Sequence, residues 1–517
     1  MLKFIEKKKN EWWSEKDVLI AGIIVGILSH IYMMTNKLPN IDDYISLFHY
    51  GSGYASGRWF LALLGNFMFK IDGTYSLPFF NGFIYILTLS LAIMIFLKPF
   101  CFENRWTKRI LAGLFLSFPT VTATMGFMFT APFYGVAVLF MAIAFYILVS
   151  YKYGFLISIV FICLSLGIYQ AYWGLAAGFL LLYLMLLCMD KQGSNLNIVL
   201  LAIKSFVALL FGVMLYLFVN QIMLSIQGVG MTEYQGLSEM GQFELSRIPE
   251  ILSMAYGWFF GFTTENYLHI TWYPYVRIVI AIGYVLTALS AVHVFIRNRK
   301  QIFKNLALLI FLAVFPLAVN SIYIMCSNAS YVHSLMCYSV VLVFLIPFVF
   351  MDGIRKENIQ GLVASGVRYG YLFAVLVVII FYIRFANIYY LNLELAFYET
   401  SHFMETLSAR IQDADNYTID KPICFYGSYR ETVNRNIWEL RMVNNMTGTV
   451  DVGNVINAPL MRKAYSRVYL GNTFYELDDL SILNEYEQQI KEMPSYPNDG
   501  SIAVMEDVVV VKFSDVN

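Results

Sequence analysis

The sequence predicts a polytopic α-helical membrane protein that ends in a small α/β domain. Three observations lead to this fold class. The chain is 59% hydrophobic and only 14% charged, whereas soluble domains average about 45–50% apolar and about 25% charged residues. Its mean hydropathy is +0.62, and apolar runs long enough to cross a bilayer recur as far as about residue 387. From about Asn392 onward, the composition becomes that of a soluble domain.

Eleven apolar segments are candidate membrane spans, when runs near or above about 18 residues are accepted and shorter runs are accepted in pairs. The least distinct boundaries fall at Met125–Thr130 and at Tyr169–Gln170, where the chain turns without a real loop. The expected spans are 17–35, 76–97, 109–124, 131–150, 154–168, 171–189, 200–224, 275–296, 303–324, 332–351 and 367–387.

Lysine and arginine are distributed unevenly between the loops on the two sides of these spans. Because cytoplasmic loops are enriched in both residues, we expect the basic side, and the N-terminus with it, to be cytoplasmic. An odd number of spans then places the C-terminal domain outside. The basic loops hold Lys3, Lys7, Lys8, Lys9, Lys16, Lys98, Arg105, Lys108, Arg109, Lys152, Lys191, Arg297, Arg299, Lys300, Lys304, Arg355, Lys356 and Arg368, and the opposite loops hold only Lys37, Arg58, Lys70 and Arg247.

Two segments are neither spans nor plain loops. Residues 59–69 are apolar but too short to cross, so we expect a helix that lies in the outer interface. The segment 225–274 carries several charges and then an apolar end, which is expected to re-enter or lie on the membrane. A connection of this length is typical of a functional loop or a lid.

The expected domains are a membrane domain over 1–390 and a soluble domain over 391–517. At roughly 125 residues, the second has the size of a small α/β or α+β domain. Its expected elements are helices over 392–412 and 479–492, a buried strand over 422–426, and a hairpin formed by 501–505 and 508–513.

An acidic pair, Asp42 and Asp43, follows the first span, and Arg58 comes shortly after it. Carboxylates at a membrane boundary are costly to desolvate, and an arginine can hold a phosphate. The group therefore indicates an enzyme that acts on a lipid-linked phosphate, with Asp42 or Asp43 as general base and Arg58 at the leaving phosphate. The structural alternative is that the acids cap the next helix. The pair can also bind Mg²⁺ or Mn²⁺, but the sequence has no dedicated set of further ligands, so no cofactor is assigned.

A second cluster, Tyr169, Gln170 and Trp173, lies at the expected outer turn of a helix pair. Aromatic rings and an amide can line a sugar pocket by stacking and hydrogen bonding. The alternative is an aromatic belt with one glutamine between helices.

Further candidates lie in the outer loops. His333 can bind phosphate or help in proton transfer, although packing is the commoner role of a lone histidine near an interface. Tyr331 is its neighbour, and Tyr134, at the outer start of the fourth span, is expected to reach the same cavity. Glu233 and Arg247, in the long loop, are candidates for contact with an acceptor.

Three segments carry a resemblance to a known family. Residues 39–44, followed by Gly57-Arg58-Trp59, resemble the start of the bacterial type II glucosyltransferases, the polytopic enzymes of O-antigen serotype conversion. Residues 165–172 resemble the second recurring segment of that family, and 507–513 resemble the ending of members from Gram-positive bacteria. The resemblance spans nearly the whole chain.

The resemblance implies a C-type glycosyltransferase in the bacterial plasma membrane, with its active site on the outer face. The implied donor is a polyprenyl-phosphate sugar, with glucose the expected sugar, and the implied acceptor is a surface glycan such as O-antigen or teichoic acid. The protein would then depend on a polyprenyl-phosphate sugar synthase and a flippase. The family relation carries its acidic residue to Asp42 or Asp43 and its arginine to Arg58, and it offers Gln170 as a pocket residue.

Two other classes compete with an enzyme. A transporter or flippase of lipid-linked sugars would share the hydrophobicity, but it should show charges near the midplane and paired repeats. A sensor or scaffold would leave the acidic pair and the long loop without a purpose. A nucleic-acid partner is not expected, because the net charge is zero.

Overall fold

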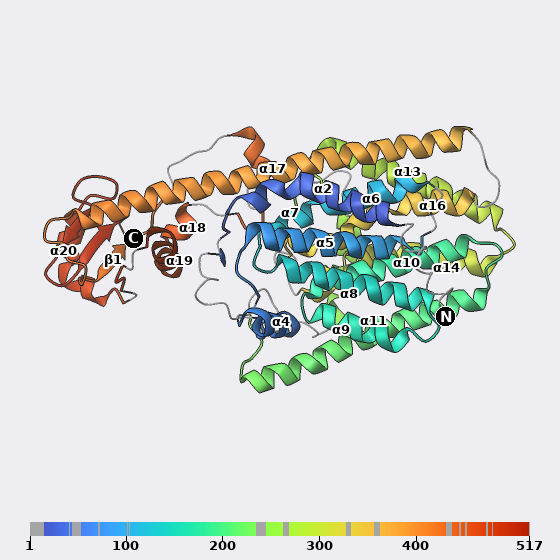
Figure 1. Ribbon diagram of the computed structural model, residues 1–517, viewed down its shortest axis with the longest axis horizontal. Helices are drawn as coiled ribbons and strands as arrows, with labels where there is room; N and C mark the ends of the chain where they lie inside the picture. Colours follow the sequence, from blue (N-terminus) through green and yellow to red (C-terminus); the bar gives the residue numbers. More distant parts are fainter. Residues whose placement is uncertain are drawn as a thin grey trace. The chain divides into compact units, whose positions relative to one another are not determined.

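The computed structural model describes residues 15–40, 42–43, 53–70, 73–100, 102, 104–233, 245–261, 268–326, 332–355, 362–430, 437–443, 446–449, 452–471, 474–477 and 479–515 (Figure 1). The chain divides into two compact units. The membrane unit comprises Met1–Lys37 and Gly51–Asn387, and the C-terminal unit comprises Leu38–Tyr50 and Ile388–Asn517. The segment that holds Asp42 and Asp43 therefore groups with the C-terminal unit, and Arg58 with the membrane unit.

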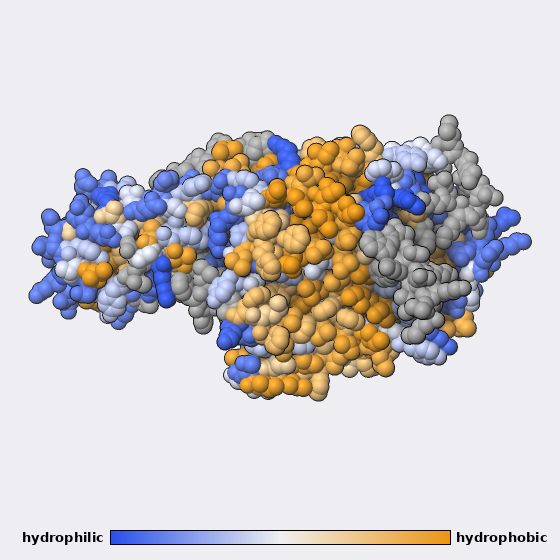
Figure 2. Space-filling view, in the orientation of Figure 1, coloured by the Kyte–Doolittle hydropathy of each residue, from blue (hydrophilic) through white to orange (hydrophobic). Residues whose placement is uncertain are grey.

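Eight helices of the described chain are long and apolar enough to cross a membrane, which confirms the prediction of a polytopic membrane protein. Large apolar side chains such as Phe206 and Leu289 are exposed on them, and Figure 2 shows an apolar band over the membrane unit. A continuous apolar surface of this kind is expected to face lipid. The eight are α2 (Lys16–Thr35), α5 (Pro78–Leu97), α8 (Ala131–Ser150), α10 (Trp173–Met189, preceded by the 3-10 turn η1, Gln170–Tyr172), α11 (Asn195–Gln227), α13 (Pro274–Arg297), α14 (Ile302–Val319) and α17 (Leu362–Gln412).

Shorter helices replace three of the expected spans. The segment 154–168 holds only α9 (Phe155–Leu166). The segment 109–124 is broken into α6 (Arg105–Ser117) and α7 (Pro119–Met125), because a proline disfavours helical geometry in the residue before it and Phe118 is extended with ψ 140°. The segment 332–351 forms η5 (Ser334–Met336), η6 (Tyr338–Phe344) and α16 (Ile346–Arg355).

Other short helices also lie in this unit. The segment 59–69 is helical as predicted, as α4 (Trp59–Phe69), and α9 (Phe155–Leu166) precedes η1. The apolar end of the long loop forms η3 (Leu245–Arg247) and α12 (Ile248–Gly261). Helix α12 packs against α14 and α15 (Ile322–Met325), and the Asn320 amide donates to the Ala255 carbonyl oxygen at 2.9 Å.

Two buried basic side chains of the membrane unit are paired with carboxylates near helix ends. Lys108, in the first turn of α6, lies 2.6 Å from the carboxylate of Glu15, which precedes α2. Arg368, near the start of α17, lies 2.5 Å from Asp352, near the end of α16. Pairing offsets the cost of removing these charges from water.

The C-terminal unit is built on a three-stranded sheet. Strand β3 (Val509–Lys512) lies between β1 (Ile423–Tyr426), to which it is parallel, and β2 (Ile502–Val504), to which it is antiparallel. The predicted hairpin and buried strand are confirmed. Their core includes Met404, Leu407 and Ile411 of α17, which pack with side chains of the sheet.

Two helices of this unit differ from the prediction. The expected helix 392–412 is not separate, because α17 runs without interruption from the membrane unit into the C-terminal unit. The expected helix 479–492 is divided into η9 (Ser481–Tyr486) and α20 (Glu487–Glu492). The remaining elements are η7 (Trp438–Met442), α18 (Val452–Ile456), α19 (Pro459–Tyr465) and the π-helical turn η8 (Ser466–Leu470).

Candidate functional site

The turn that carries Arg58 is docked on the segment that contains Gln170. The backbone amides of Phe60 and Leu61, in the first turn of α4, donate to the Gly167 carbonyl oxygen at 2.8 and 3.2 Å. The indole of Trp59 lies so close to Gly167 that a β-carbon there would come within 2.6 Å of it. The structure thus brings together two sequence segments that lie more than one hundred residues apart.

Two side chains hold the backbone just before Arg58. The Gln170 amide nitrogen donates to the Ser56 carbonyl oxygen at 3.1 Å and to the Tyr216 hydroxyl at 2.9 Å. The Tyr216 hydroxyl donates to the Gly57 carbonyl oxygen at 3.1 Å. Both side chains are buried, so these hydrogen bonds are shielded from water. We call Gln170 and Tyr216 the turn clamp.

Gly57 is required by this geometry. Its φ of +71° lies in the left-handed region, which residues with a β-carbon rarely adopt. A β-carbon at Gly57 would also lie 2.5 Å from the Tyr216 hydroxyl and 2.8 Å from the Gln170 amide nitrogen. The turn clamp therefore fits only a glycine at this position.

The guanidinium of Arg58 lies against a cluster of tyrosines. Its central carbon is 5.3 Å from the centre of the Tyr169 ring, within the range of a cation–π interaction. Tyr169 stacks on Tyr134 at 4.4 Å, and Tyr172 meets Tyr169 edge-on at 5.3 Å. Within the described part of the chain, the buried Tyr169 hydroxyl has no hydrogen-bond partner. The predicted residues Arg58, Tyr134, Tyr169 and Gln170 thus lie in one cluster.

The start of the long loop reaches the same turn. The Thr232 amide donates to the Ala55 carbonyl oxygen at 2.9 Å. Glu233 follows directly and is exposed. This places the Glu233 backbone next to the turn that leads into Arg58.

Asp42 and Asp43 lie at the beginning of a helical turn in the C-terminal unit. The Asn40 side-chain oxygen accepts hydrogen bonds from the amides of Asp42, at 2.7 Å, and Asp43, at 3.1 Å. The Asp43 carboxylate in turn accepts from the Asn40 amide at 3.2 Å. This reciprocal pattern is a capping box. The helix-cap alternative therefore applies to Asp43, with Asn40 as the N-cap residue.

The two carboxylates differ in exposure. Asp43 is 3% exposed, whereas Asp42 is half-buried. The charge of Asp43 also acts on Tyr469 in η8, where burial, and then this charge, raise the pKa of the phenol well above its usual range. Asp42 is thus the more accessible of the pair.

The other predicted residues are placed as follows. The Arg247 guanidinium donates to the Cys326 carbonyl oxygen at 3.1 Å and lies 3.8 Å from the Glu250 carboxylate. His333 precedes η5 and is half-buried, and burial lowers the pKa of its imidazole. Trp173 begins α10, next to the tyrosine cluster in sequence. Tyr331 lies outside the described residues.

Sequence reasoning missed Tyr216 and Asn40. Tyr216 lies within the long apolar helix α11, where no local pattern indicates a partner 159 residues away. Asn40 could have been found, because an asparagine three residues before an acidic residue is the spacing of a capping box. Among the described residues, no group of three or more histidine, cysteine, aspartate or glutamate side chains could hold a metal ion.

The apolar helices and their exposed apolar surface define an integral membrane protein. The family model Glucosyl transferase GtrII matches residues 31–344, so the chain belongs to this family of glucosyltransferases, as the resemblance predicted. The match includes Asp42, Asp43 and both segments of the docked turn, Gly57–Trp59 and Gly167–Gln170. No curated protein and no solved structure matches the chain.

Proposed function

We propose that the protein transfers a sugar, with glucose the expected one, from a polyprenyl-phosphate donor to a surface glycan such as O-antigen or teichoic acid. Membership of a glucosyltransferase family and the apolar helices support a membrane glycosyltransferase. The observation that carries the more specific proposal is the docked turn, which holds an arginine against a tyrosine cluster. In this proposal the fold is of the C-type, and the reaction occurs on the outer face of the bacterial plasma membrane.

Arg58 stabilises the leaving polyprenyl phosphate in this mechanism. A guanidinium forms charge-assisted hydrogen bonds to phosphate oxygens, and its stabilising effect grows as the bond to the sugar breaks and charge accumulates on the phosphate. The turn clamp fixes the backbone before Arg58, and the Tyr169 ring supports its guanidinium. We assign Tyr169, Gln170 and His333 to the donor side.

Asp42 or Asp43 acts as the general base. The carboxylate takes the proton of the acceptor hydroxyl as its oxygen attacks the anomeric carbon. The acceptor oxygen attacks from the face opposite the phosphate as the bond from that carbon to the phosphate oxygen breaks, so the configuration at the anomeric carbon inverts. The greater accessibility of Asp42 favours it over Asp43, whose carboxylate is used in the capping box.

In this proposal Tyr134, Trp173, Glu233, Arg247 and Tyr331 line the substrate pocket or contact the acceptor. The C-terminal unit, which we expect to lie outside, contributes to recognition of the glycan in this proposal. The donor is made by a cytoplasmic synthase and brought outward by a flippase. The mechanism gives no role to a divalent cation, and adding EDTA tests this.

Single variants test the assignment of the base. Asp42→Asn and Asp43→Asn are assayed separately in membranes that contain polyprenyl-phosphate glucose and acceptor glycan. The variant that removes the base should lose about 10²–10⁴-fold in kcat, and its thermal stability should match the wild type. Full activity in both single variants and in the double variant would overturn the assignment.

A further inference from the structure

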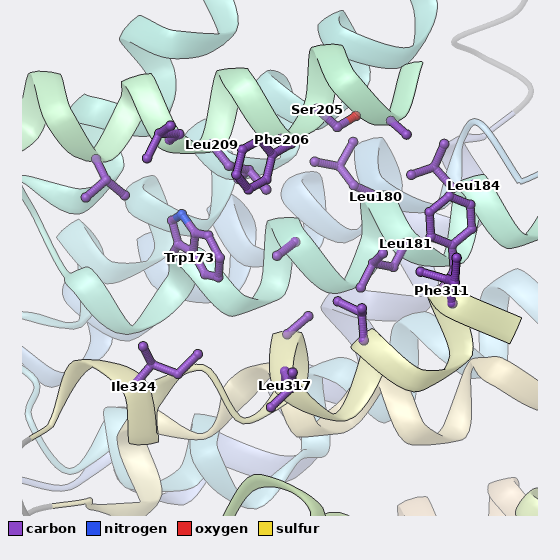
Figure 3. A pocket seen from close by; sticks show the side chains of 17 residues that line it. Trp173, Leu180, Leu181, Leu184, Ser205, Phe206, Leu209, Phe311, Leu317 and Ile324 are labelled. Carbon is purple, nitrogen blue, oxygen red and sulfur yellow. The ribbon is translucent and has the colours of Figure 1, made fainter. Parts of the chain in front are cut away.

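An apolar cleft lies between helices of the membrane unit, beside the Arg58 cluster in sequence. Helix α10 packs against both α11 and α14, and side chains of all three helices line the cleft (Figure 3). Its volume is about 520 Å³, within the usual size of a ligand pocket, about 300–1,000 Å³. Apart from Trp173 and Ser205, its lining side chains are hydrocarbon.

The cleft is long and opens toward the side of the helices that faces lipid. Trp173 and Leu184 line it at positions about 16 Å apart along α10, at 1.5 Å per residue. Its floor is buried, as Leu180 and Leu184 show, whereas Phe206 and Ile310 on its rim are 67% and 50% exposed. A long chain can therefore enter from the bilayer without crossing the bundle.

One end of the cleft carries a polar donor. The indole nitrogen of Trp173 is buried and has no hydrogen-bond partner among the described residues. Trp173 is three residues from Gln170, whose amide holds the turn that leads into Arg58. The hydroxyl of Ser205, on the α11 wall of the cleft (Figure 3), also has no hydrogen-bond partner among the residues that the structure describes. A ligand with a polar group at the Trp173 end and a hydrocarbon chain beyond it fits this lining.

We propose that the cleft binds the isoprenoid tail of the lipid donor. The phosphate end lies at Trp173, whose indole N–H donates to a phosphate oxygen, and the chain extends past Leu180 toward Leu184 and Phe311. This inference rests on the proposed function. It adds that the enzyme selects its donor by the length of the chain, because a longer chain buries more apolar surface in the cleft.

The test compares two donors in the full-length protein reconstituted in phosphatidylglycerol nanodiscs. One is a long-chain polyprenyl-phosphate glucose, and the other is an analogue with only a few isoprene units. The wild type should have a KM for the long donor at least tenfold below that for the short one. Ala202→Trp places a large ring on the cleft wall and should raise the KM for the long donor at least tenfold, with kcat for the short donor within twofold.

The matched control is Ile203→Trp. Ile203 is the next residue of α11, is 56% exposed and does not line the cleft. It should keep the wild-type preference for the long donor. Equal preference in the wild type and Ala202→Trp would overturn the inference while leaving the proposed function intact.

A second measurement does not depend on turnover. A diazirine-bearing polyprenyl phosphate should label peptides from α10, α11 and α14 in the wild type, and long-chain polyprenyl phosphate should compete with it. Competition by phosphatidylglycerol to the same extent would show a general lipid site and would overturn the inference. If the wild type turns over neither donor but is labelled specifically, the proposed function fails and the isoprenoid site stands.

Discussion

The turn clamp predicts a large effect from one added methyl group. Gly57→Ala places a β-carbon 2.5 Å from the Tyr216 hydroxyl and 2.8 Å from the Gln170 amide nitrogen. It also puts an alanine at φ +71°, which costs about 1–2 kcal/mol. If the clash breaks one or two of the clamp hydrogen bonds, each contributes about 0.5–1.5 kcal/mol more. The clamped turn should therefore be destabilised by about 1.5–5 kcal/mol in total.

This cost falls on the conformation that presents Arg58. A loss of 1.4 kcal/mol in transition-state stabilisation is about tenfold in rate, so kcat/KM for sugar transfer should fall at least about tenfold. The assay measures initial rates in nanodiscs with saturating acceptor and varied donor. Tyr216→Phe removes only the hydroxyl, and its kcat/KM should fall by about 3- to 10-fold.

Gly228→Ala is the matched control. Gly228 ends α11 with φ +65°, and a β-carbon added there would have no heavy atom within 4 Å. The variant therefore carries the backbone cost without the clash, and its kcat/KM should stay within threefold of the wild type. Gly57→Ala activity within twofold of the wild type, or equal losses in both variants, would refute the role of the turn clamp.

Three further predictions concern single side chains. Arg58→Lys keeps the charge but loses the planar donor pair and the stacking on Tyr169, so kcat should fall about 10- to 100-fold. A wild-type kcat in this variant would contradict the role of Arg58 at the phosphate. Arg462→Met leaves the buried carboxylate of Glu476 without the guanidinium nitrogen that donates to it at 3.1 Å. The C-terminal unit should therefore lose about 3–5 kcal/mol of stability. An unchanged melting temperature would contradict this prediction. Burial lowers the pKa of His333, so the unfolded chain binds a proton more readily than the folded chain. The stability of the fold should therefore decrease as the pH drops below about 6.5. His333→Gln should reduce this loss in melting experiments at acid pH, and a pH profile identical to that of the wild type would contradict the prediction.

Apolar pattern was sufficient to predict most of the helices. Long apolar runs, such as those of α8 and α13, were found within a few residues of their ends. The continuity of α17 was not predicted, because its composition changes near Asn392 while its backbone does not. A helix satisfies its own backbone hydrogen bonds in lipid and in water alike, so a change in the surrounding medium need not end it.

The candidate site was predicted in part. Arg58, Tyr169 and Gln170 were selected from sequence, and the structure brings them together. Tyr216 was not selected, since its hydrogen bond to Gly57 joins residues 159 positions apart and leaves no trace in local spacing. Long-range side-chain contacts of this kind depend on how helices pack, which the apolar pattern does not specify.

Sugar transfer by the purified protein tests the central claim most directly. Synthetic polyprenyl-phosphate glucose and an acceptor glycan are supplied to the wild type and to the Asp42→Asn/Asp43→Asn double variant, with and without EDTA. We predict that the wild type releases one polyprenyl phosphate for each glucose added to the acceptor, with inversion at the anomeric carbon, and that the double variant does not. The contradicting result is movement of the lipid donor across the bilayer without transfer of glucose, galactose or N-acetylglucosamine to any of a panel of wall glycans. That result would indicate a transporter.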